Sequence, residues 1–423
     1  MNWDVIGYNE LAVILPGFAA FSRGVLGGNS PVAGNIQQVR SAGRVGSVSE
    51  AGSARLGLLS GQDPASAELA RRFLAISMRY LPQAYADREF AFTLRGAGAP
   101  AGGWQLQRAG TSARYGAIAA LGLMRLAEPA QRALLAGETC QDLIGTLAKS
   151  LDLITNLGDM AMLCWAAAEA KHSELPRAVA RLAELDRPAD PVDVVAAAWA
   201  VSALVAARPH LDVERHLAAA RHRLLAARGK MAYPHTTGGN AQRYRAHLGS
   251  FADQVYPVQA LARLHGSADD PEALATASAV ARVICAAQGS AGQWWWHYDS
   301  RTGGVVEGYP VYSVHQHSMA PMALLDLADA GGQAHLESIC RGLAWLDSRP
   351  ETSADLVLED PPVIWRKVAR NDPRKLVRGL RAVATGMCPG MRISVLDRIY
   401  PPTEIDRECR PYELGWLLFT WLS

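Results

Sequence analysis

Six short, alanine-rich and strongly apolar segments recur along the chain, each preceded by polar or turn residues. Segments such as DVVAAAWAVSALVAA and PYELGWLLFTWL are apolar on nearly every face, which is typical of helices buried on all sides. One repeat takes roughly 56 residues, enough for a helical hairpin and a connecting loop. The repeat therefore indicates a structure built from similar helical units. The six segments begin at Ser112, Gly158, Asp193, Phe251, His315 and Pro411.

Amphipathic helices are predicted between these segments. Stretches such as ASAELARRFLAISMRYL place apolar residues at i, i+3, i+4 and i+7. Inner and outer helices that alternate six times predict an all-α fold, an (α/α)6 toroid of six helical hairpins over residues 61–423. An open solenoid is the alternative, but the very apolar last repeat favours a closed ring. Residues 1–60 are rich in Gly and Ser, and we expect them to form an irregular N-terminal arm.

Composition excludes several classes of protein. The chain has 42 Lys and Arg against 40 Asp and Glu, so it lacks the basic field of a nucleic-acid-binding protein. No run reaches the ~18 apolar residues of a transmembrane helix. Asp4, Glu10 and Pro16 interrupt the amino-terminal apolar stretch, which makes it a poor signal peptide. The six cysteines form no C-x-x-C pair, so we expect free buried thiols and a cytoplasmic protein that binds a small-molecule or glycan substrate.

One local motif carries a resemblance to a known family. Gln288, Gly292 and Trp294 fit the pattern Q-x-x-x-G-x-W, which resembles the QW repeats of squalene-hopene-type cyclases, and Gly103-Trp104 resembles a degenerate copy. The resemblance implies an element that ties the end of an outer helix to the next inner helix. The acidic cyclase motif D-x-D-D is absent, and so is D-D-x-x-D, to which residues 269–273 come nearest. The motif thus supports the architecture rather than terpenoid cyclisation.

The densest group of chemically useful side chains lies between Trp294 and Met322. Its aromatic rings offer flat apolar faces with polar edges, which suit stacking on sugar rings, and its histidines, tyrosines and carboxylates suit acid–base work. The alternative is that the tryptophans fill the ring and the histidines satisfy buried carbonyls. We expect catalytic candidates at His297, Asp299, Glu307, Tyr309, Tyr312, His315 and His317, and substrate contacts at Trp294, Trp295, Trp296, Arg301 and Gln316.

A second group precedes the fourth inner segment, and two smaller groups flank the first and the last. Arg243 and Arg245 would share one face of an extended loop and could grip a carboxylate. Asp253 and Glu413 occupy comparable places in their repeats, as general acids or bases or as charges that stabilise a helix start. We expect Trp365, Arg366 and Arg370 on a helix. The remaining substrate-binding candidates are Trp104, Arg114, Tyr233, His235 and Arg410.

Cofactors and metals find no support in the sequence. His315 and His317 form an H-x-H pair, but no third ligand follows from the spacing. Phosphate loops, dinucleotide fingerprints and the G-x-S-x-G nucleophile elbow do not occur. We therefore expect no metal and no cofactor.

These residues favour a carbohydrate-active enzyme that acts on an acidic glycan, because the repeat and the aromatic group resemble (α/α)6 glycoside hydrolases, polysaccharide lyases and sugar epimerases. Tyr and His suit proton transfer next to a carboxylate that Arg neutralises, as in a lyase or epimerase. A hydrolase would instead need two carboxylates across the site, from Asp253, Asp299, Glu307 or Glu413. Two alternatives remain: a cyclase-like or prenyl-binding protein, and a non-catalytic helical-repeat binding protein.

Overall fold

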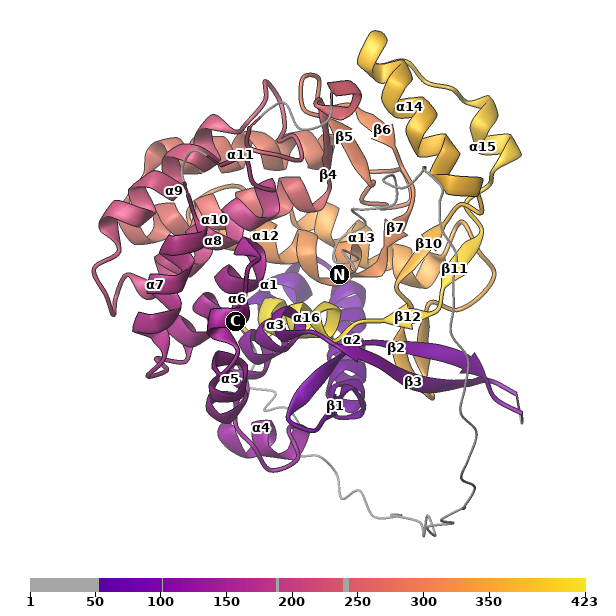
Figure 1. Ribbon diagram of the computed structural model, residues 1–423. Coiled ribbons are helices and arrows are strands. Elements are labelled where there is room, and N and C mark those ends of the chain that lie inside the picture. Colours follow the sequence, from indigo (N-terminus) through magenta and orange to yellow (C-terminus); the bar gives the residue numbers. More distant parts are fainter. Residues whose placement is uncertain (1–52, 101, 188–189, 239–242) are drawn as a thin grey trace, which may run out of the picture. The chain divides into compact units, whose positions relative to one another are not determined.

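The computed structural model describes residues 53–100, 102–187, 190–238 and 243–423, so most of the predicted arm lies outside it. In the described residues, six inner helices stand side by side and six outer helices accompany them (Figure 1). The inner helices are α3 (Ala113–Leu123), α6 (Leu157–Glu169), α8 (Val194–Ala207), α10 (Ala252–Ala268), α12 (Ala320–Asp329) and α16 (Pro411–Trp421). The outer helices are α2 (Pro64–Ala84), α5 (Cys140–Ala148), α7 (Leu175–Leu185), α9 (Glu214–Ala226), α11 (Pro271–Ala286) and α13 (Leu336–Ser348).

Burial separates the inner from the outer helices as the apolar pattern predicts. Every residue of α8 except Ala206 is buried, because the helix has neighbours on all sides. Outer helix α7 buries only Leu175, Ala178 and Leu182, which lie on one face at helical spacing. The prediction of a mostly helical (α/α)6 architecture is confirmed.

The inner helices form a closed ring rather than an open solenoid. Each inner helix packs on the next in chain order, and α16 packs back on α3. At that closing contact, a Cβ on Gly122 would lie 2.2 Å from the carbonyl oxygen of Gly415, and a Cβ on Gly415 would lie 2.8 Å from Cα of Ala119. Only glycines let the two backbones approach this closely, so this pair fixes where the ring closes.

Aromatic side chains fill the axis of the ring. Trp165 packs against Trp416 and Phe419 with ring centroids 5.6 and 5.7 Å apart, and Trp199 meets Tyr256 at 4.9 Å. Trp416 Nε1 donates a hydrogen bond to the hydroxyl of Tyr256 at 3.0 Å, which links α16 to α10 across the ring. This axial aromatic cluster separates the amino ends of the inner helices from their carboxyl ends.

Short strands lead into several inner helices, and the sequence did not predict them. They are β1 (Tyr85–Ala86), β2 (Glu89–Gly98), β3 (Trp104–Thr111) and β12 (Glu408–Cys409) in one sheet; β4 (Leu248–Ser250), β5 (His297–Asp299) and β6 (Val305–Glu307) in a second; β7 (Val311–Tyr312), β10 (Lys367–Ala369) and β11 (Glu404–Asp406) in a third; and the pair β8 (Val357–Glu359) and β9 (Pro362–Ile364).

The helix expected at Trp365, Arg366 and Arg370 is wrong, and Arg370 follows β10 outside any helix. Trp365 and Arg366 join β9 to β10, whose Val368 pairs with Val311 of β7 and Ile405 of β11. Successive side chains of a strand point to opposite faces of the sheet, a period of two residues that a helix does not have. The sheet brings Arg366 beside the segment that precedes α12.

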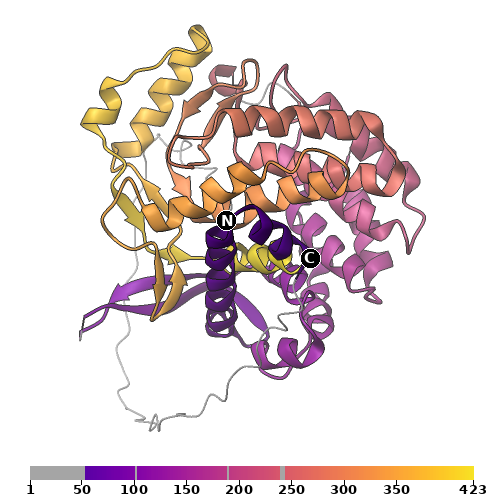
Figure 2. The ribbon, with the colours of Figure 1, turned by 180° about the vertical axis from the view of Figure 1, so that it is seen from behind.

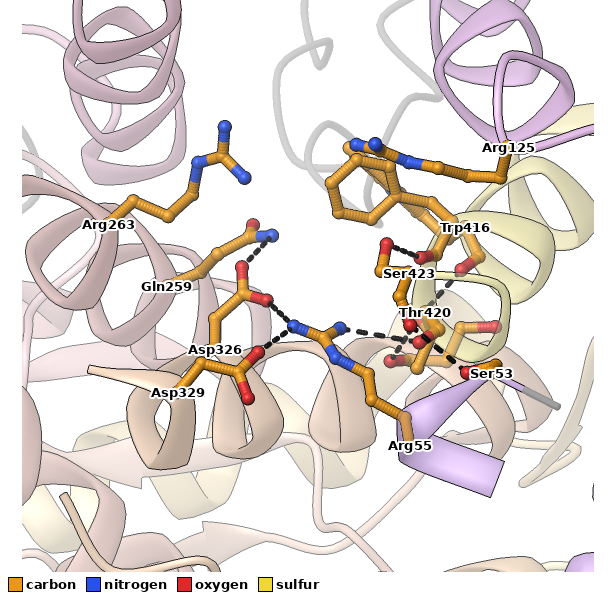
Figure 3. Close-up of polar contacts among 12 residues, drawn as sticks. Ser53, Arg55, Arg125, Gln259, Arg263, Asp326, Asp329, Trp416, Thr420 and Ser423 are labelled. Carbon is orange, nitrogen blue, oxygen red and sulfur yellow. Dashed lines mark hydrogen bonds and ion pairs between the residues drawn. The ribbon is translucent and has the colours of Figure 1, made fainter. Parts of the chain in front are cut away.

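Helix α1 (Ala54–Gln62) makes polar contacts with the carboxyl ends of inner helices (Figures 2 and 3). The last part of the arm that we expected to be irregular is therefore helical. Arg55 Nη2 donates to Asp326 and Asp329 at 2.5 Å each, and Arg55 Nη1 donates to the carbonyl of Thr420. Gln259 Nε2 donates to the other carboxylate oxygen of Asp326 at 3.0 Å. A guanidinium at helix carboxyl ends also meets the negative ends of the helix dipoles.

Two further helices form a hairpin at one edge of the described fold: α14 (Leu376–Met387) and α15 (Val395–Ile399), drawn in yellow in Figure 1. The other short elements are α4 (Glu128–Leu134), the 3₁₀ turns η1 (Leu151–Leu153), η2 (Arg243–Arg245) and η4 (Pro373–Lys375), and the π-helical turn η3 (His315–Met319). Among the described residues, no helix combines the length and hydrophobicity that crossing a bilayer requires.

All six cysteines are free. Cys140, Cys164 and Cys409 are buried, as the sequence predicts. Cys388 is exposed at the end of α14, which corrects the expectation of buried thiols throughout.

Candidate active site

Titratable and aromatic side chains gather where the inner helices begin. Asp193 is the residue before α8, Asp253 lies in the first turn of α10, and Arg410 and Glu413 begin α16. Strands β4 and β12 end directly before α10 and α16, and β7 ends before the turn that leads to α12. This end of the ring therefore receives side chains from parts of the chain that are far apart in the sequence.

Asp193, His235 and Asp253 form a chain of three groups. His235 Nε2 lies 3.4 Å from Asp193 Oδ1, and His235 Nδ1 lies 3.5 Å from Asp253 Oδ1. Asp253 is fully buried and accepts hydrogen bonds from the backbone N–H and hydroxyl of Ser250 at 2.7 and 2.8 Å, which fixes its position. Asp193 has 47% of its side chain exposed, so the chain runs from a buried carboxylate to one that solvent reaches.

The surroundings of this chain raise the pKa values of Asp193 and His235. Desolvation raises the pKa of Asp193, and the negative charge of Asp253 adds to it, while His235 and Arg114 act in the opposite direction. Burial alone would lower the pKa of His235, but the carboxylates of Asp253 and Asp193 outweigh it and raise that pKa. Asp193 is thus a carboxyl group that holds its proton more firmly than usual at a site open to solvent.

A second carboxylate, Asp159, lies on the neighbouring inner helix. Arg114 donates from Nε to Asp159 and from Nη2 to Asn156 Oδ1 at 2.7 Å. The Arg114 guanidinium also lies over the ring of Trp199, 5.2 Å from its centroid, at the edge of the axial aromatic cluster. Asp159 keeps 37% of its side chain exposed. Two carboxylates on adjacent helices therefore face solvent, with Arg114 near both.

Tyr312 lies among cations. The Arg366 guanidinium lies 5.1 Å and the Lys367 ammonium 5.4 Å from the Tyr312 ring centroid. Burial would raise the pKa of Tyr312, but Lys367, Arg366, Arg378 and Arg410 together hold it below its ordinary value. Tyr312 is 4% exposed, whereas Lys367 keeps 22% of its side chain exposed and pairs with Asp406 at 3.0 Å. Lys367 and Arg378 are partly exposed, whereas Arg366 and Arg410 are buried.

Glu413 and Arg410 lie next to this cationic group. Glu413 accepts from the backbone N–H of Arg410 at 3.3 Å and lies 3.4 Å from Arg366 Nε. Burial raises the pKa of Glu413 to about 7, although Arg366 and Arg410 oppose the shift. Arg410 Nη1 donates to the Tyr115 hydroxyl at 2.9 Å. These contacts anchor the start of α16 to α3 and place a carboxyl group that titrates near neutrality deep beside Arg366.

Three of the predicted histidines are buried. His315 stacks on Trp296 at 5.9 Å and lies 5.0 Å from the ring of Tyr312. Burial, with cationic neighbours, lowers the pKa of His315 and His297 well below the ordinary value, and burial lowers that of His317 to about 3. His315 and His297 therefore remain neutral imidazoles, each with an Nδ1 that has no hydrogen-bond partner among the described residues.

The acidic and the cationic side chains at this end of the ring form two groups, although Asp406 and Glu413 lie against the cations. The carboxylates Asp193 and Asp253 belong to the starts of α8 and α10. The cations around Tyr312 come from β10, α14 and the start of α16. Since α8 and α16 are three places apart in a ring of six, the exposed acid and the cationic group lie on opposite sides. A ligand held there would meet an acid on one side and positive charge on the other.

Other predicted residues lie elsewhere. Asp299 forms a two-pronged pair with Arg301, which also donates to the carbonyl of Thr385 and lines a 420 Å³ pocket. Glu307 pairs with Arg370 and Arg381, while Tyr309 donates to Glu351 at 2.9 Å. Trp295 and Tyr309 line a separate 650 Å³ pocket. These residues hold loops and the α14–α15 hairpin in place rather than joining the helix starts.

The tryptophan run is divided between two faces of its segment. Trp294 and Trp296 are fully buried, and Trp295 is partly exposed. Gln316 is buried, and its Oε1 accepts a hydrogen bond from the backbone N–H of Trp294. Tyr233 is also buried, and its backbone N–H donates a hydrogen bond to Gln254 Oε1. Trp104 lies at the start of β3 under the guanidinium of Arg407.

The two arginines expected on an extended loop lie in a 3₁₀ turn. Arg243–Arg245 form η2, in which residues two apart do not share a face, and this corrects the geometry that we expected. Arg245 is partly exposed, and the side chain of Arg243 lies outside the described residues.

The Q-x-x-x-G-x-W element connects neighbouring helices. Gln288 Nε2 donates to the carbonyls of Gly292 and Ser338 at 3.0 and 2.9 Å, and Arg341 donates to Gln288 Oε1. A Cβ on Gly342 would lie 2.7 Å from Trp294 Nε1. The element therefore ties the end of α11 to outer helix α13.

Sequence reasoning missed several residues of the site. Asp193 was used only as the start of a repeat, although a carboxylate directly before an all-apolar helix is a signal that could have identified it. Lys367 and Arg378 were not singled out, because only the strand pairing of β10 and the docking of α14 bring them to Tyr312. Within the part of the chain that the structure describes, no group of three or more His, Cys, Asp or Glu residues could hold a metal ion.

No protein-family model and no curated protein sequence matches this chain. Among solved structures, it resembles an unsaturated glucuronyl hydrolase specific for heparin, with a TM-score of 0.53, 14% identity, and coverage of 83% of this chain and 95% of that one. It also resembles the unsaturated glucuronyl hydrolase responsible for the degradation of glycosaminoglycan from Bacillus sp. GL1, with a TM-score of 0.51, 15% identity, and coverage of 83% and 94%. At such identities the likeness shows the shared fold.

Proposed function

We propose that this chain is a carbohydrate-active enzyme that cleaves a glycan next to a uronate residue, using Asp193 as the proton donor. The single observation that carries the proposal is the environment of Asp193: an exposed carboxyl of raised pKa, backed by His235 and a buried Asp253. A general acid needs a pKa shifted toward neutrality and access to substrate, and Asp193 has a raised pKa and a side chain that solvent reaches. The glucuronyl hydrolases with the same fold support a uronate-containing substrate.

In the proposed reaction, the Asp193 proton moves to the glycosidic oxygen as the bond from that oxygen to the sugar carbon breaks. A water molecule adds its oxygen to that carbon and gives up a proton to a carboxylate. Asp159 is the candidate acceptor, because it is the other exposed carboxylate near Arg114. The two groups then have the complementary roles that hydrolysis of a glycosidic bond requires.

The cationic group opposite Asp193 would bind the uronate carboxylate. Lys367 is an accessible cation of this group, and the buried Arg366 adds positive potential in a site largely shielded from water. A neutral sugar of the same shape would gain none of this interaction. The separation of charge across the ring therefore favours an acidic glycan over a neutral one.

A second chemistry is favoured by one observation, the lowered pKa of Tyr312. A phenolate beside Arg366 and Lys367 could remove the proton next to the uronate carboxylate, as in a lyase or an epimerase. Tyr312 is only 4% exposed, and a base must reach the carbon that it deprotonates. This burial favours hydrolysis over the lyase or epimerase reaction.

Turnover of paired substrates tests the proposal. The panel holds saturated and unsaturated uronyl disaccharides, each with an analogue whose carboxylate is reduced to an alcohol. We expect reducing-sugar release from at least one uronyl substrate and at least tenfold less from its reduced analogue, since a charge-assisted contact is worth roughly 1.5–3 kcal/mol. Formation of a new conjugated double bond would support Tyr312 chemistry instead, and equal turnover of both partners would contradict uronate recognition.

A further inference from the structure

The α14–α15 hairpin carries an outward apolar face. Seven of the ten large hydrophobic residues that are exposed in the described part of the chain lie between residues 376 and 399. On α14 they are spaced by four, three and four residues, which places them on one side of the helix. The seven are Leu376, Leu380, Val383, Met387, Met391, Val395 and Ile399.

The opposite face of α14 is already occupied by the rest of the fold. Arg381 pairs with the buried Glu307, Thr385 contacts His247 at 3.0 Å, and Ala382 packs with Leu248 and Val306. The hairpin is therefore fixed in place by its inner face. The elements that α14 mainly contacts are η2, β6 and η4, and Val383 and Met387 also line the 420 Å³ pocket beside His247. Monomeric proteins seldom expose such a contiguous apolar face without a partner.

Positive charge accompanies this apolar face. The segment from 370 to 400 contains seven basic residues and two acidic ones, and both acids are engaged: Asp372 accepts from the backbone N–H of Val377, and Asp397 bridges Arg370 and Arg381. Three exposed arginines form no ion pair with any described residue: Arg374, Arg392 and Arg398. The free charge of the hairpin surface is therefore positive.

We propose that this hairpin docks on an anionic lipid surface. An amphipathic helix with aliphatic side chains on one face and arginines at its borders binds at the membrane interface, with its apolar face buried among the acyl chains. A second copy fits less well, because a two-fold interface sets the patch against itself and would bring the unpaired arginines together. In Figure 1 the hairpin lies at an edge of the described fold, where a surface could approach it.

Docking would bring the candidate site to the lipid surface. Arg378, on the inner side of α14, lies over the ring of Trp296 and contributes to the cations around Tyr312. The same helix thus links the apolar face to the amino ends of the inner helices. The docking inference does not depend on the proposed reaction.

Vesicle flotation of the full chain tests the proposal with two compositions, phosphatidylcholine alone and phosphatidylcholine with phosphatidylglycerol. We expect binding to the anionic vesicles. The double variant Leu380→Glu/Met387→Glu should lose it, and Arg392→Gln/Arg398→Gln should weaken it roughly 30-fold, from about 1 kcal/mol per charge. The control is Leu153→Glu, an exposed leucine outside the hairpin, which should bind like wild type.

Three results would overturn the proposal. Equal binding to neutral and anionic vesicles would remove the role of the arginines, and equal loss in Leu153→Glu would show non-specific adsorption. Absence of binding to either vesicle would reject a lipid partner. In that case, analytical ultracentrifugation would show what covers the face. A dimer that Leu380→Glu dissociates would assign the face to a second copy, and a monomer would assign it to an acidic protein. Circular dichroism and melting of each variant check that the fold is retained.

Discussion

The two ends of the inner-helix ring arrange their charged side chains differently. At the carboxyl end, Arg55 sits between Asp326 and Asp329, so opposite charges neutralise one another in direct contact (Figure 3). At the amino end, Asp193 precedes α8, whereas the cations around Tyr312 lie by α16, three places along the ring of six inner helices. Breaking a buried pair costs stability, whereas charges that are not in contact leave a field that can act on a ligand.

The pKa values follow the same division. At the carboxyl end, burial alone would lower the pKa of Arg55, but Asp326 and Asp329 outweigh burial and raise it. The guanidinium therefore stays charged. At the amino end, Asp193 and Glu413 have raised pKa values and Tyr312 a lowered one, so each moves toward the neutral range. Groups that titrate near neutral pH are the ones that can exchange protons with a substrate.

Removing one carboxylate from each end gives the largest expected contrast. Asp193→Asn should lower kcat by roughly 10²–10⁴-fold, the usual contribution of a general acid, with little change in melting temperature. Asp329→Asn removes a 62% exposed carboxylate at the other end and should leave kcat unchanged. Steady-state kinetics and thermal melts check both. Equal kinetic losses in the two variants would erase the distinction between the ends.

Arg55→Met should affect stability and not chemistry. The substitution leaves the buried Asp326 with only Gln259 as a partner, and breaking a buried pair costs about 3–5 kcal/mol. Denaturant unfolding should show this loss, while kcat per folded molecule stays at the wild-type value. Arg71→Met is the matched control, since Arg71 forms only an exposed pair with Glu68. A kcat that falls with Arg55 would place chemistry at the carboxyl end.

Glu413 should make stability depend on pH near neutrality. Its folded pKa of about 7 lies above the ordinary 4.5, so the folded state binds the proton more tightly. Stability from this group is full below pH 4.5 and falls as the pH rises to about 7, by about 2–3 kcal/mol. Glu413→Gln should flatten this fall in unfolding curves collected between those pH values. A variant that parallels wild type throughout would mean that Glu413 titrates normally.

The glycine contact that closes the ring should give the smallest effect of the four. Gly415→Ala places a methyl group 2.8 Å from backbone atoms of α3, and such overpacking costs about 1–3 kcal/mol. Gly266→Ala, in α10, has open space and should be neutral or stabilising. Urea unfolding of both compares them. If Gly415→Ala behaves like Gly266→Ala, the closing contact is looser than its geometry indicates.

The sequence predicted the helical ring well because the signal for it is local. Helices such as α8 are apolar on every side over many residues, and that pattern repeated six times indicates buried helices in a repeated helical structure. The small sheets were missed because their strands are two to ten residues long and pair with distant segments, as Glu408 of β12 does with Arg95 of β2. Short strands depend on tertiary pairing more than on composition.

The site was predicted only in part, for a similar reason. His235, Asp253, Tyr312 and Glu413 do lie at the helix starts, where the repeat placed them. The tryptophan run was read as one surface, but alternate residues of an extended segment face opposite ways, so Trp294 and Trp296 turn inward. Whether a charged residue meets its partner across the ring depends on contacts hundreds of residues apart, which a single sequence does not record.

Hydrogen exchange with a bound acidic disaccharide reports which end of the ring a ligand protects. We expect slower exchange in segments 190–198, 231–238, 309–316, 363–369 and 408–415, with no change in 54–62, 326–332 and 418–423. Protection confined to the second set, around Arg55 and Asp326, would contradict the assignment of the chemistry to the amino ends of the inner helices.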